Sequence, residues 1–266
     1  MNRDFIAKHW YADIYEQFEN QTDDVEFLLN LLRQRKNGAP QKILEAACGG
    51  GRICLPLAKA GHIVTGFDAD AHMLLRCYRK MKGMSNIVCY SADALTSDWG
   101  SDFDVVVLAG NLLLNIETDT DYAKAQQIFI RKAASALKPG GHLFLDFDLL
   151  FDPARFFSSL RESSYFSGTD DMGTSGRTVS CGSVYDPVTR ICAGTNHWEL
   201  TTNNGESFII PKVWHKHIPT QAQVYSWLDE AGLSIERSFK NYLDEPIPEP
   251  IDESTFRATV WAKKNT

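Results

Sequence analysis

The stretch Ile43–Ala58, ILEAACGGGRICLPLA, decides the fold of this chain. A short apolar run ends at Glu45, three glycines follow at Gly49–Gly51, and a new amphipathic segment begins behind them. This order predicts a strand, a tight glycine turn and a helix. Glycine permits positive φ and lets a ligand approach the backbone closely, while the helix N-terminus presents unpaired N–H groups that favour an anionic group. In an α/β sheet such a turn lies at the carboxyl end of its strand, where ligands bind.

The composition is that of an ordinary globular protein with an acidic balance. The chain has 266 residues, of which 44% are apolar and 23% are charged, and its formal net charge is −7. This length allows one large domain or a domain with a sizeable insertion. Because no basic run is present, we expect neither nucleic acid nor an anionic membrane as a partner. The charge balance favours a neutral or cationic small molecule instead.

The N-terminal segment and the cysteines both favour a reducing, cytoplasmic location. The first residues, MNRDFIAKHWYADIY, lack the apolar core of a signal peptide, and no apolar run reaches membrane-spanning length. No two cysteines form a CxxC pair, so we expect neither a zinc ribbon nor a thioredoxin-like motif, and no bound metal. Several cysteines lie in apolar periodic segments, as small buried hydrophobic residues do. The six are Cys48, Cys54, Cys77, Cys89, Cys181 and Cys192.

Apolar runs and helical segments alternate along most of the chain. This alternation predicts an α/β fold with a doubly wound, seven-stranded, mostly parallel sheet and right-handed crossovers. From about 160 to 218 the pattern changes to short strands joined by turn residues, which predicts an antiparallel β insertion. Strands are expected at 42–46, 62–67, 86–90, 103–108, 142–147, 233–240 and 255–263, and helices at 3–18, 22–36, 52–60, 70–81, 120–137 and 220–231.

Acidic residues mark the ends of the first three strands, at Glu45, Asp68 and Asp93. Asp68 follows Gly49 by nineteen positions, where a carboxylate can hold a ribose diol. Such acids can also simply cap helices, but three of them beside a glycine turn favour a nucleoside site. A dinucleotide fingerprint wants a glycine where Cys54 stands, and Glu45 is awkward beside a pyrophosphate. A ligand that is itself a cation fits these carboxylates better.

With these residues the chain resembles the class I S-adenosylmethionine-dependent methyltransferases. Beside the glycine motif, GFDADAHML at Gly66–Leu74, ADAL at Ala92–Leu95 and LKPGGHLFLDF at Leu137–Phe147 agree with the family in order and spacing. The resemblance covers about 10–150 and 220–263, and it implies S-adenosylmethionine as cofactor. It implies that Ala47, Gly49 and Gly51 lie along the methionine part of the cofactor, that Asp68 binds the ribose, and that Ala69, Met73, Asp93, Ala94 and Leu95 surround the adenine.

The segment LAGNLLLN, Leu108–Asn115, is similar to the matching loop of glycine N-methyltransferases and of some sugar-amine N-methyltransferases. The resemblance places this loop between cofactor and acceptor, with Ala109 and Gly110 beside the cofactor and Asn111 and Asn115 orienting the acceptor. The family's glycine N-methyltransferases carry a histidine at the place of Asn115, so the substrate does not transfer. Asn115 can equally cap the next turn.

Further candidates depend on less specific signals. Asp146 and Asp148 at the end of the fifth strand are candidate groups for orienting or deprotonating an amine, or a surface carboxylate pair. Tyr11 and Tyr15, at i, i+4 spacing on the first helix, could cover the sulfonium or only pack an amphipathic helix. Arg52 could pair with the cofactor carboxylate or be only a surface residue at a helix start.

The insertion is expected to be a substrate lid. His215 and His217 alternate to one strand face, but no acidic or cysteine partner is placed to complete a metal set. The aromatic and histidine residues of this segment would suit an amine or a planar small molecule. Its candidate acceptor-binding residues are Tyr165, His197, Trp198, Trp214 and His215.

The sequence predicts three domain segments and one activity. We expect N-terminal helices at 1–40 over the cofactor site, a cofactor-binding core at 41–155 and 219–266, and the lid at 156–218. The predicted reaction is methyl transfer by in-line displacement to a small-molecule acceptor, preferably an amine nitrogen, in a monomer or homodimer. The alternatives are an O-methyltransferase and a non-catalytic regulatory protein that binds the same cofactor; a nicotinamide-dependent reductase is disfavoured by Cys54 and Glu45.

Overall fold

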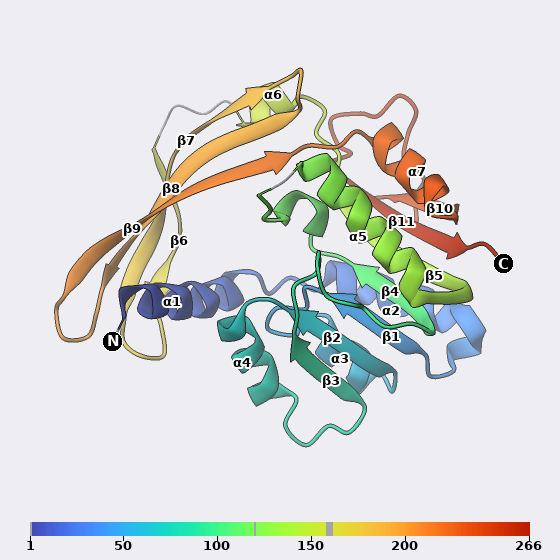
Figure 1. Ribbon diagram of the computed structural model, residues 1–266, viewed down its shortest axis with the longest axis horizontal. Helices are drawn as coiled ribbons and strands as arrows, with labels where there is room; N and C mark the ends of the chain where they lie inside the picture. The colour runs from blue at the N-terminus through green and yellow to red at the C-terminus, as the bar shows by residue number, and fades with distance from the viewer. Residues whose placement is uncertain (1, 120, 158–161) are drawn as a thin grey trace. The chain divides into compact units, whose positions relative to one another are not determined.

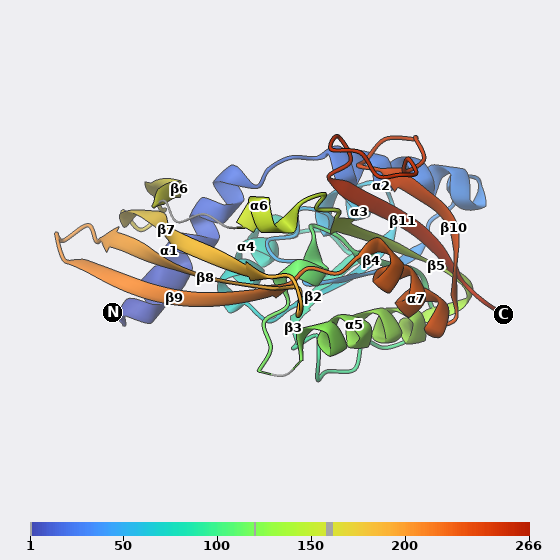
Figure 2. The ribbon, with the colours of Figure 1, turned by 90° about the horizontal axis from the view of Figure 1, so that it is seen from above.

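The computed structural model describes residues 2–119, 121–157 and 162–266 (Figures 1 and 2). The chain divides into two compact units. One, which we call the core unit, comprises Gln21–Phe151 and Pro219–Thr266; the other, the insertion unit, comprises Met1–Asn20 and Asp152–Ile218. The predicted helix start at 120 and part of the predicted lid, 158–161, lie outside the described residues. Among the described residues, no helix has the length and apolar character needed to cross a membrane.

The core unit contains the predicted seven-stranded sheet, in the order β10-β11-β5-β4-β1-β2-β3. The five strands from β5 to β3 pair in parallel, while β11 is antiparallel to both β5 and β10. The predicted fold class is therefore confirmed. The strands are β1 (Lys42–Ala46), β2 (Ile63–Asp68), β3 (Ile87–Ser91), β4 (Phe103–Leu108), β5 (Leu137–Asp148), β10 (Leu233–Lys240) and β11 (Arg257–Lys264).

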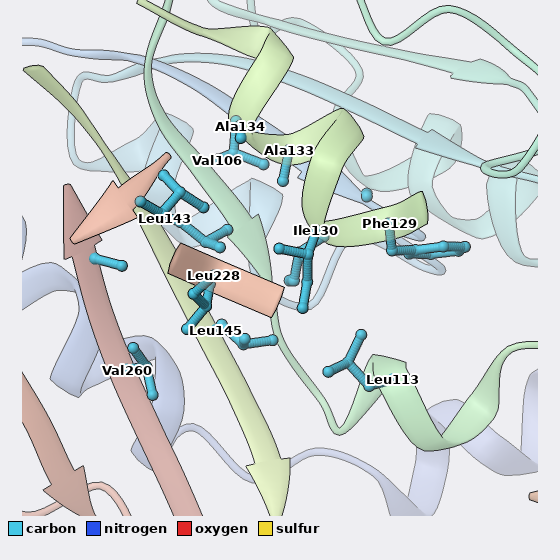
Figure 3. Close-up of a cluster of buried hydrophobic side chains, with 14 of the residues drawn as sticks. Val106, Leu113, Phe129, Ile130, Ala133, Ala134, Leu143, Leu145, Leu228 and Val260 are labelled. Atoms are coloured by element: carbon cyan, nitrogen blue, oxygen red, sulfur yellow. The ribbon is translucent and has the colours of Figure 1, made fainter. Parts of the chain in front are cut away.

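Helices of the core unit cover both faces of this sheet. All six side chains of β4 are buried, and its last four alternate between two hydrophobic clusters: Val106 and Leu108 belong to one, Val105 and Val107 to the other. The first cluster includes side chains of α5 and α7 (Figure 3), and the second includes side chains of α2, α3 and α4. The helices are α2 (Asp23–Gln34), α3 (Cys54–Lys59), α4 (Ala71–Lys80), α5 (Tyr122–Ala136) and α7 (Gln221–Glu230), with short 3₁₀ turns η1 (Arg35–Gly38) and η2 (Leu112–Asn115).

The insertion unit is an antiparallel sheet with one long helix. The sheet has the order β6-β7-β8-β9, as the turn pattern predicts. The first helix packs on it: Trp10 is fully buried in a cluster with Trp198 and Leu200, and its indole N–H donates to the Gly168 carbonyl at 3.1 Å. A short helix that was not predicted precedes the sheet, because the Asp152 side chain accepts from the Arg155 amide and starts a turn. The elements are α1 (Arg3–Phe18), α6 (Pro153–Phe157), β6 (Ser163–Thr169), β7 (Ser175–Asp186), β8 (Ile191–Thr201) and β9 (Ser207–His217).

Candidate functional site

The glycine turn after β1 has the backbone that its sequence predicts. Ala47, Gly49 and Gly51 all have positive φ, of 54°, 51° and 82°. Within the part of the chain that the structure describes, no heavy atom lies within 4 Å of the position that a Cβ on Gly49 would take, so the backbone there is open to a ligand. The helix behind the turn begins at Cys54 rather than at 52, because the turn continues through Ile53.

Asp68 at the end of β2 joins the glycine turn to the next loop. Its carboxylate accepts from the Gly49 amide at 2.8 Å and from the Asp70 amide at 2.7 Å. Burial raises the pKa of this carboxyl group, against the lowering effect of these amides. Each oxygen keeps a second lone pair for a further donor. The arrangement can therefore hold a diol beside the glycine turn.

The residues predicted around an adenine follow β2 and β3. Ala69 is exposed and Met73 is half-buried near the start of α4. Asp93 is exposed, and its Oδ1 accepts from the amides of Leu95 and Thr96, which lower its pKa together with the Thr96 hydroxyl. The capping role left open by the sequence is therefore present for this oxygen. Ala94 and Leu95 are half-buried in the same turn.

Arg52 brings the glycine turn close to the loop after β4. Its guanidinium makes two hydrogen bonds of 2.6 Å to the buried carboxylate of Asp24 at the start of α2, and one of 2.9 Å to the Gln21 carbonyl. The same guanidinium lies 3.8 Å from the position that a Cβ on Gly110 would take. Arg52 is thus a strut of the core unit, by which we mean a side chain that links the glycine turn to the start of α2 and holds it there. Its predicted pairing with a cofactor carboxylate stays a prediction.

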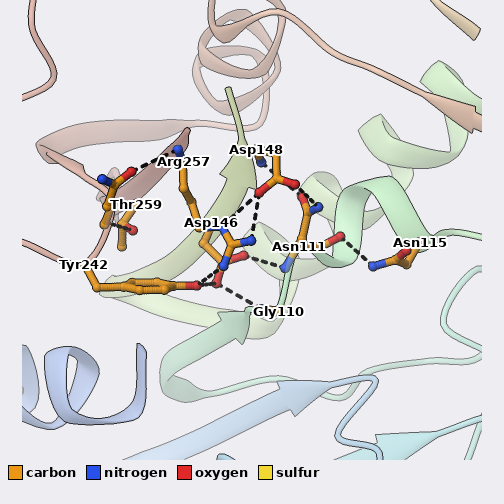
Figure 4. Close-up of polar contacts among 9 residues, drawn as sticks. Gly110, Asn111, Asn115, Asp146, Asp148, Tyr242, Arg257 and Thr259 are labelled. Atoms are coloured by element: carbon orange, nitrogen blue, oxygen red, sulfur yellow. Dashed lines mark hydrogen bonds and ion pairs between the residues drawn. The ribbon is translucent and has the colours of Figure 1, made fainter. Parts of the chain in front are cut away.

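The loop after β4 is fixed by a buried carboxylate. Gly110 (φ 73°) and Asn111 (φ 58°) both adopt the left-handed conformation. Their amides donate to Asp146 at 2.9 and 2.6 Å, and the Tyr242 hydroxyl donates to the same carboxylate at 2.9 Å (Figure 4). Burial raises the pKa of Asp146, while the nearby Arg257 guanidinium and these donors lower it. Ala109, also predicted beside the cofactor, is half-buried just before this loop.

The side chain of Asn111 is also held in place. Its amide group donates to Asp148 Oδ2 at 2.6 Å, and its carbonyl oxygen accepts from the Asp148 amide at 3.1 Å. Arg257 at the start of β11 donates two hydrogen bonds to Asp148 Oδ1, at 2.9 and 2.8 Å. The side-chain amide of Asn115 donates to the backbone carbonyl of Asn111 at 3.1 Å (Figure 4). The structure therefore brings the predicted catalytic residues together as one hydrogen-bonded network.

Tyr242 and Arg257 complete this network, and sequence reasoning missed both. They lie 96 residues beyond Asp146 and 109 residues beyond Asp148. They lie in or beside the antiparallel end of the sheet, far along the chain from every glycine or acidic motif. The register of β11 on β5, which pairs Arg257 with Asp148, brings them there. A single sequence carries no signal for that register.

The remaining candidates lie in the insertion unit. Tyr11 stacks on Trp198 with ring centroids 4.8 Å apart, and both rings lie near the Lys212 ammonium. The Tyr165 hydroxyl accepts from the Asn196 side chain, and His197 lies 3.2 Å from the Cys181 thiol and 3.1 Å from Glu199. The Trp214 ring covers Gly194, while Tyr15 and His215 are exposed. Their predicted contacts with cofactor or acceptor stay predictions.

Comparison with known proteins finds similarity in the core unit. A family model described as "Methyltransferase domain" matches residues 43–141. A relative from Chelativorans sp. (strain BNC1), named ubiquinone biosynthesis O-methyltransferase, is 36% identical over 107 residues, which is 39% of each chain. One of the same name from Saccharophagus degradans is 25% identical over 208 residues, 70% of this chain and 84% of the relative. The match thus spans about two fifths of the first relative's length.

Solved structures show the same fold over the whole chain. An S-adenosylmethionine-dependent methyltransferase from Clostridium acetobutylicum covers 100% of both chains with a TM-score of 0.75 at 13% identity. CalS10, described as an amino pentose methyltransferase from Micromonospora echinaspora with S-adenosylmethionine bound, covers 91% of both chains with a TM-score of 0.63 at 17% identity. At these identities the likenesses show the fold, and they agree with the fold class that the sequence predicts.

Proposed function

We propose that this chain is an S-adenosylmethionine-dependent methyltransferase that transfers the methyl group of this cofactor to an amine nitrogen of a small molecule. The observation that carries the proposal is the joining of two loops at the carboxyl edge of the parallel strands. The Gly49–Asp68 pair fits an adenosyl ligand, and Arg52 lies between this turn and the left-handed loop at Gly110. The family that the sequence resembles has cofactor and acceptor meeting at such a loop.

The residues at the glycine turn fit the cofactor. The open backbone at Gly49 allows close approach, and the Asp68 carboxylate has lone pairs for the two ribose hydroxyls. We assign the methionine part to Ala47, Gly49 and Gly51, and the adenine to the half-buried or exposed side chains of the next two loops. When bound, the cofactor supplies a methyl group made electrophilic by its sulfonium. The assigned adenine contacts are Ala69, Met73, Asp93, Ala94 and Leu95.

The loop after β4 would position the acceptor. In-line attack needs the acceptor lone pair aligned with the methyl group, and such alignment can supply about 7–11 kcal/mol of the barrier. Gly110 has no side chain to keep the reacting atoms apart. Asn111 and Asp148 fix each other through two hydrogen bonds, so they would act on the acceptor with little rotational freedom.

Asp146 has a different role in this proposal. It is fully buried, and its carboxylate already accepts from two amides and a tyrosine. We therefore assign it as a positioning residue that holds the loop, rather than as the group that takes the proton. A neutral amine would attack through its lone pair, and the proton would then pass from the new ammonium group to water.

An oxygen acceptor is the second candidate. The two relatives compared above are named ubiquinone biosynthesis O-methyltransferases, which favours a hydroxyl acceptor. The amine reading depends instead on the resemblance of Leu108–Asn115 to N-methyltransferase loops and on the fold shared with CalS10. A hydroxyl acceptor needs a base to remove its proton, whereas an unprotonated amine does not.

Binding and turnover assays on the full chain separate these possibilities. Calorimetric titration with S-adenosylhomocysteine should show saturable binding, weakened at least tenfold in Asp68→Ala, because hydrogen bonds to a charged acceptor contribute about 1.5–3 kcal/mol. Turnover is then followed by S-adenosylhomocysteine release with matched acceptors, an amino sugar against its hydroxy analogue and a catechol. Methylation of the amino sugar alone supports the proposal, and methylation of the catechol alone overturns the amine reading. Binding without turnover on any acceptor would favour the regulatory alternative.

A further inference from the structure

Four cysteines from four different elements converge inside the core unit. They come from the glycine turn (Cys48), the first residue of α3 (Cys54), the middle of α4 (Cys77) and β3 (Cys89). All four are reduced and buried, with exposed fractions of 0–7%. The sulfur atoms of Cys48, Cys54 and Cys89 lie within 4.8 Å of one another, and the sulfur of Cys77 lies 3.4 Å from that of Cys89.

Two glycines make room for these sulfur atoms. A Cβ on Gly66, in the middle of β2, would lie 2.8 Å from the Cys54 sulfur and 2.9 Å from the Cys48 sulfur. A Cβ on Gly51 would lie 2.8 Å from the Cys77 sulfur. Gly66 has ordinary strand φ, so here the absence of a side chain serves space rather than backbone conformation. Both glycines thus border the same cluster of thiols.

Polar groups also point at the cluster. Gly66 pairs with Cys89 between β2 and β3, and its backbone amide lies beside the Cys89 sulfur. The buried carboxyl group of Glu45 lies beside Cys54, and its Oε2 has no hydrogen-bond partner among the described residues. A cluster of purely apolar packing would not need these polar neighbours. They are a second observation, independent of the sulfur distances.

We propose that Cys48, Cys54, Cys77 and Cys89 bind one thiophilic divalent metal ion of the zinc class in a four-thiolate site. Tetrahedral zinc has Zn–S bonds of about 2.3 Å, which places the sulfur atoms about 3.8 Å apart. The limit of 4.8 Å admits this spacing for Cys48, Cys54 and Cys89. Cys77 lies outside that group of three, with its sulfur 3.4 Å from the Cys89 sulfur, and would close on the ion as the fourth ligand. Binding replaces four S–H bonds by four metal–sulfur bonds and releases four protons to solvent, with no change in oxidation state.

The metal would stabilise the surface that holds the cofactor. The Cys48 amide donates to the Phe67 carbonyl and the Cys48 carbonyl accepts from the Gly51 amide, so a ligand at Cys48 restrains the glycine turn. The other three ligands connect α3, α4 and β3. A bound ion would therefore fix the relative positions of Gly49 and Asp68. The site does not depend on the identity of the acceptor or on turnover.

Metal content and cobalt spectroscopy test the site on the full chain. Protein purified under reducing conditions without chelator should contain about one zinc per chain by elemental analysis. After zinc removal, anaerobic titration with Co²⁺ should give the intense visible bands of tetrahedral cobalt–thiolate, and zinc should displace them. Thermal unfolding should shift upward when zinc is restored, because a ligand that binds only the folded state stabilises it.

Matched variants locate the site. Cys54→Ser and Cys77→Ser should lose the cobalt–thiolate bands or shift them to fewer sulfur ligands, while Cys181→Ser, at an exposed thiol of the insertion unit, should keep them. Should the core variants fail to fold, the cobalt titration of the unaltered chain still tests whether the metal site exists. A reduced, folded protein that takes up neither zinc nor cobalt overturns the proposal, as do cobalt–thiolate bands that are unchanged in both core variants. A disulfide between Cys77 and Cys89 in freshly isolated protein, with no metal, overturns it too. Binding of S-adenosylhomocysteine, measured separately, reports the proposed function alone.

Discussion

Breaking the ion pair between Arg52 and Asp24 should loosen the glycine turn by an amount that the structure allows us to work out. Asp24 is 5% exposed, and the Arg52 side chain is 32% exposed. Two hydrogen bonds of 2.6 Å join them, and Arg52 also donates to the Gln21 carbonyl. Removing one partner of a fully buried pair costs about 3–5 kcal/mol, mainly because the other charge is left buried and unpaired. Because Arg52 is partly exposed, we expect about 2–3 kcal/mol for Arg52→Ala.

A double-mutant cycle isolates the pair. Arg52→Ala, Asp24→Asn and the double variant are unfolded in urea, and the coupling free energy is the difference between the double change and the sum of the single changes. We expect a coupling of about 1.5–2.5 kcal/mol, and Arg52→Ala should lower the melting temperature by about 4–12 °C. Asp23→Asn, at the exposed neighbouring position, serves as the control and should change stability by less than about 0.5 kcal/mol.

The same variants separate the two interpretations of Arg52. If Arg52 acts as a strut, Arg52→Ala and Asp24→Asn should weaken binding of S-adenosylhomocysteine by similar factors, because both release the turn. A contact of Arg52 with the cofactor carboxylate would instead weaken binding in Arg52→Ala alone. A coupling below about 0.5 kcal/mol, the usual limit of independent sites, would refute the strut reasoning altogether.

The remaining predictions concern the two loops. Asp146→Asn should lower kcat at least tenfold while changing the Kd for S-adenosylhomocysteine less than threefold, because it alters the group that accepts from the Gly110 and Asn111 amides. Single-turnover kinetics measure the rate and calorimetry measures the Kd. A larger effect on Kd than on kcat would contradict the assignment of Asp146 as a positioning residue. Tyr242→Phe should cost about 1–3 kcal/mol in urea unfolding, since it removes two hydrogen bonds, one to Asp146 and one from Arg257, and leaves the Gly110 and Asn111 amides satisfied. No loss of stability would show that the Tyr242 hydroxyl contributes nothing. Burial raises the pKa of Asp68, so its ionised fraction should rise with pH from about 4 and then level off, and the affinity for S-adenosylhomocysteine should follow it. Asp68→Asn should lack this pH dependence. If calorimetry across pH 4–7 shows the same slope in both proteins, the result argues against the contact of Asp68 with the ribose.

Local sequence signals were sufficient to predict the strands of the parallel sheet and the glycine turn of the core unit. The apolar run at β4 is buried on both sides, and the alternation of its last four side chains between two clusters follows from the period of a strand. The glycine turn and the acid at Asp68 also meet as expected, because consecutive parallel strands end at one edge of a sheet. These features depend on neighbours in sequence or on adjacent strands.

Features that depend on distant partners could not be predicted. Asp146 was interpreted as a candidate base, but its surroundings include Tyr242 and Arg257 from the last part of the chain. Several cysteines were interpreted as small buried hydrophobic residues, and only the packing of α3, α4 and β3 brings Cys54, Cys77 and Cys89 together. Likewise, the first helix belongs to the unit that contains the antiparallel sheet, which no local pattern reveals.

The most direct measurement is a crystal structure of the full chain with S-adenosylhomocysteine bound. The account predicts the ribose hydroxyls on the Asp68 carboxylate, the homocysteine part along Gly49–Gly51, and the sulfur atom facing the loop at Gly110. An adenosyl group bound away from the ends of β1 and β2, or a site that stays empty at millimolar ligand, would contradict it.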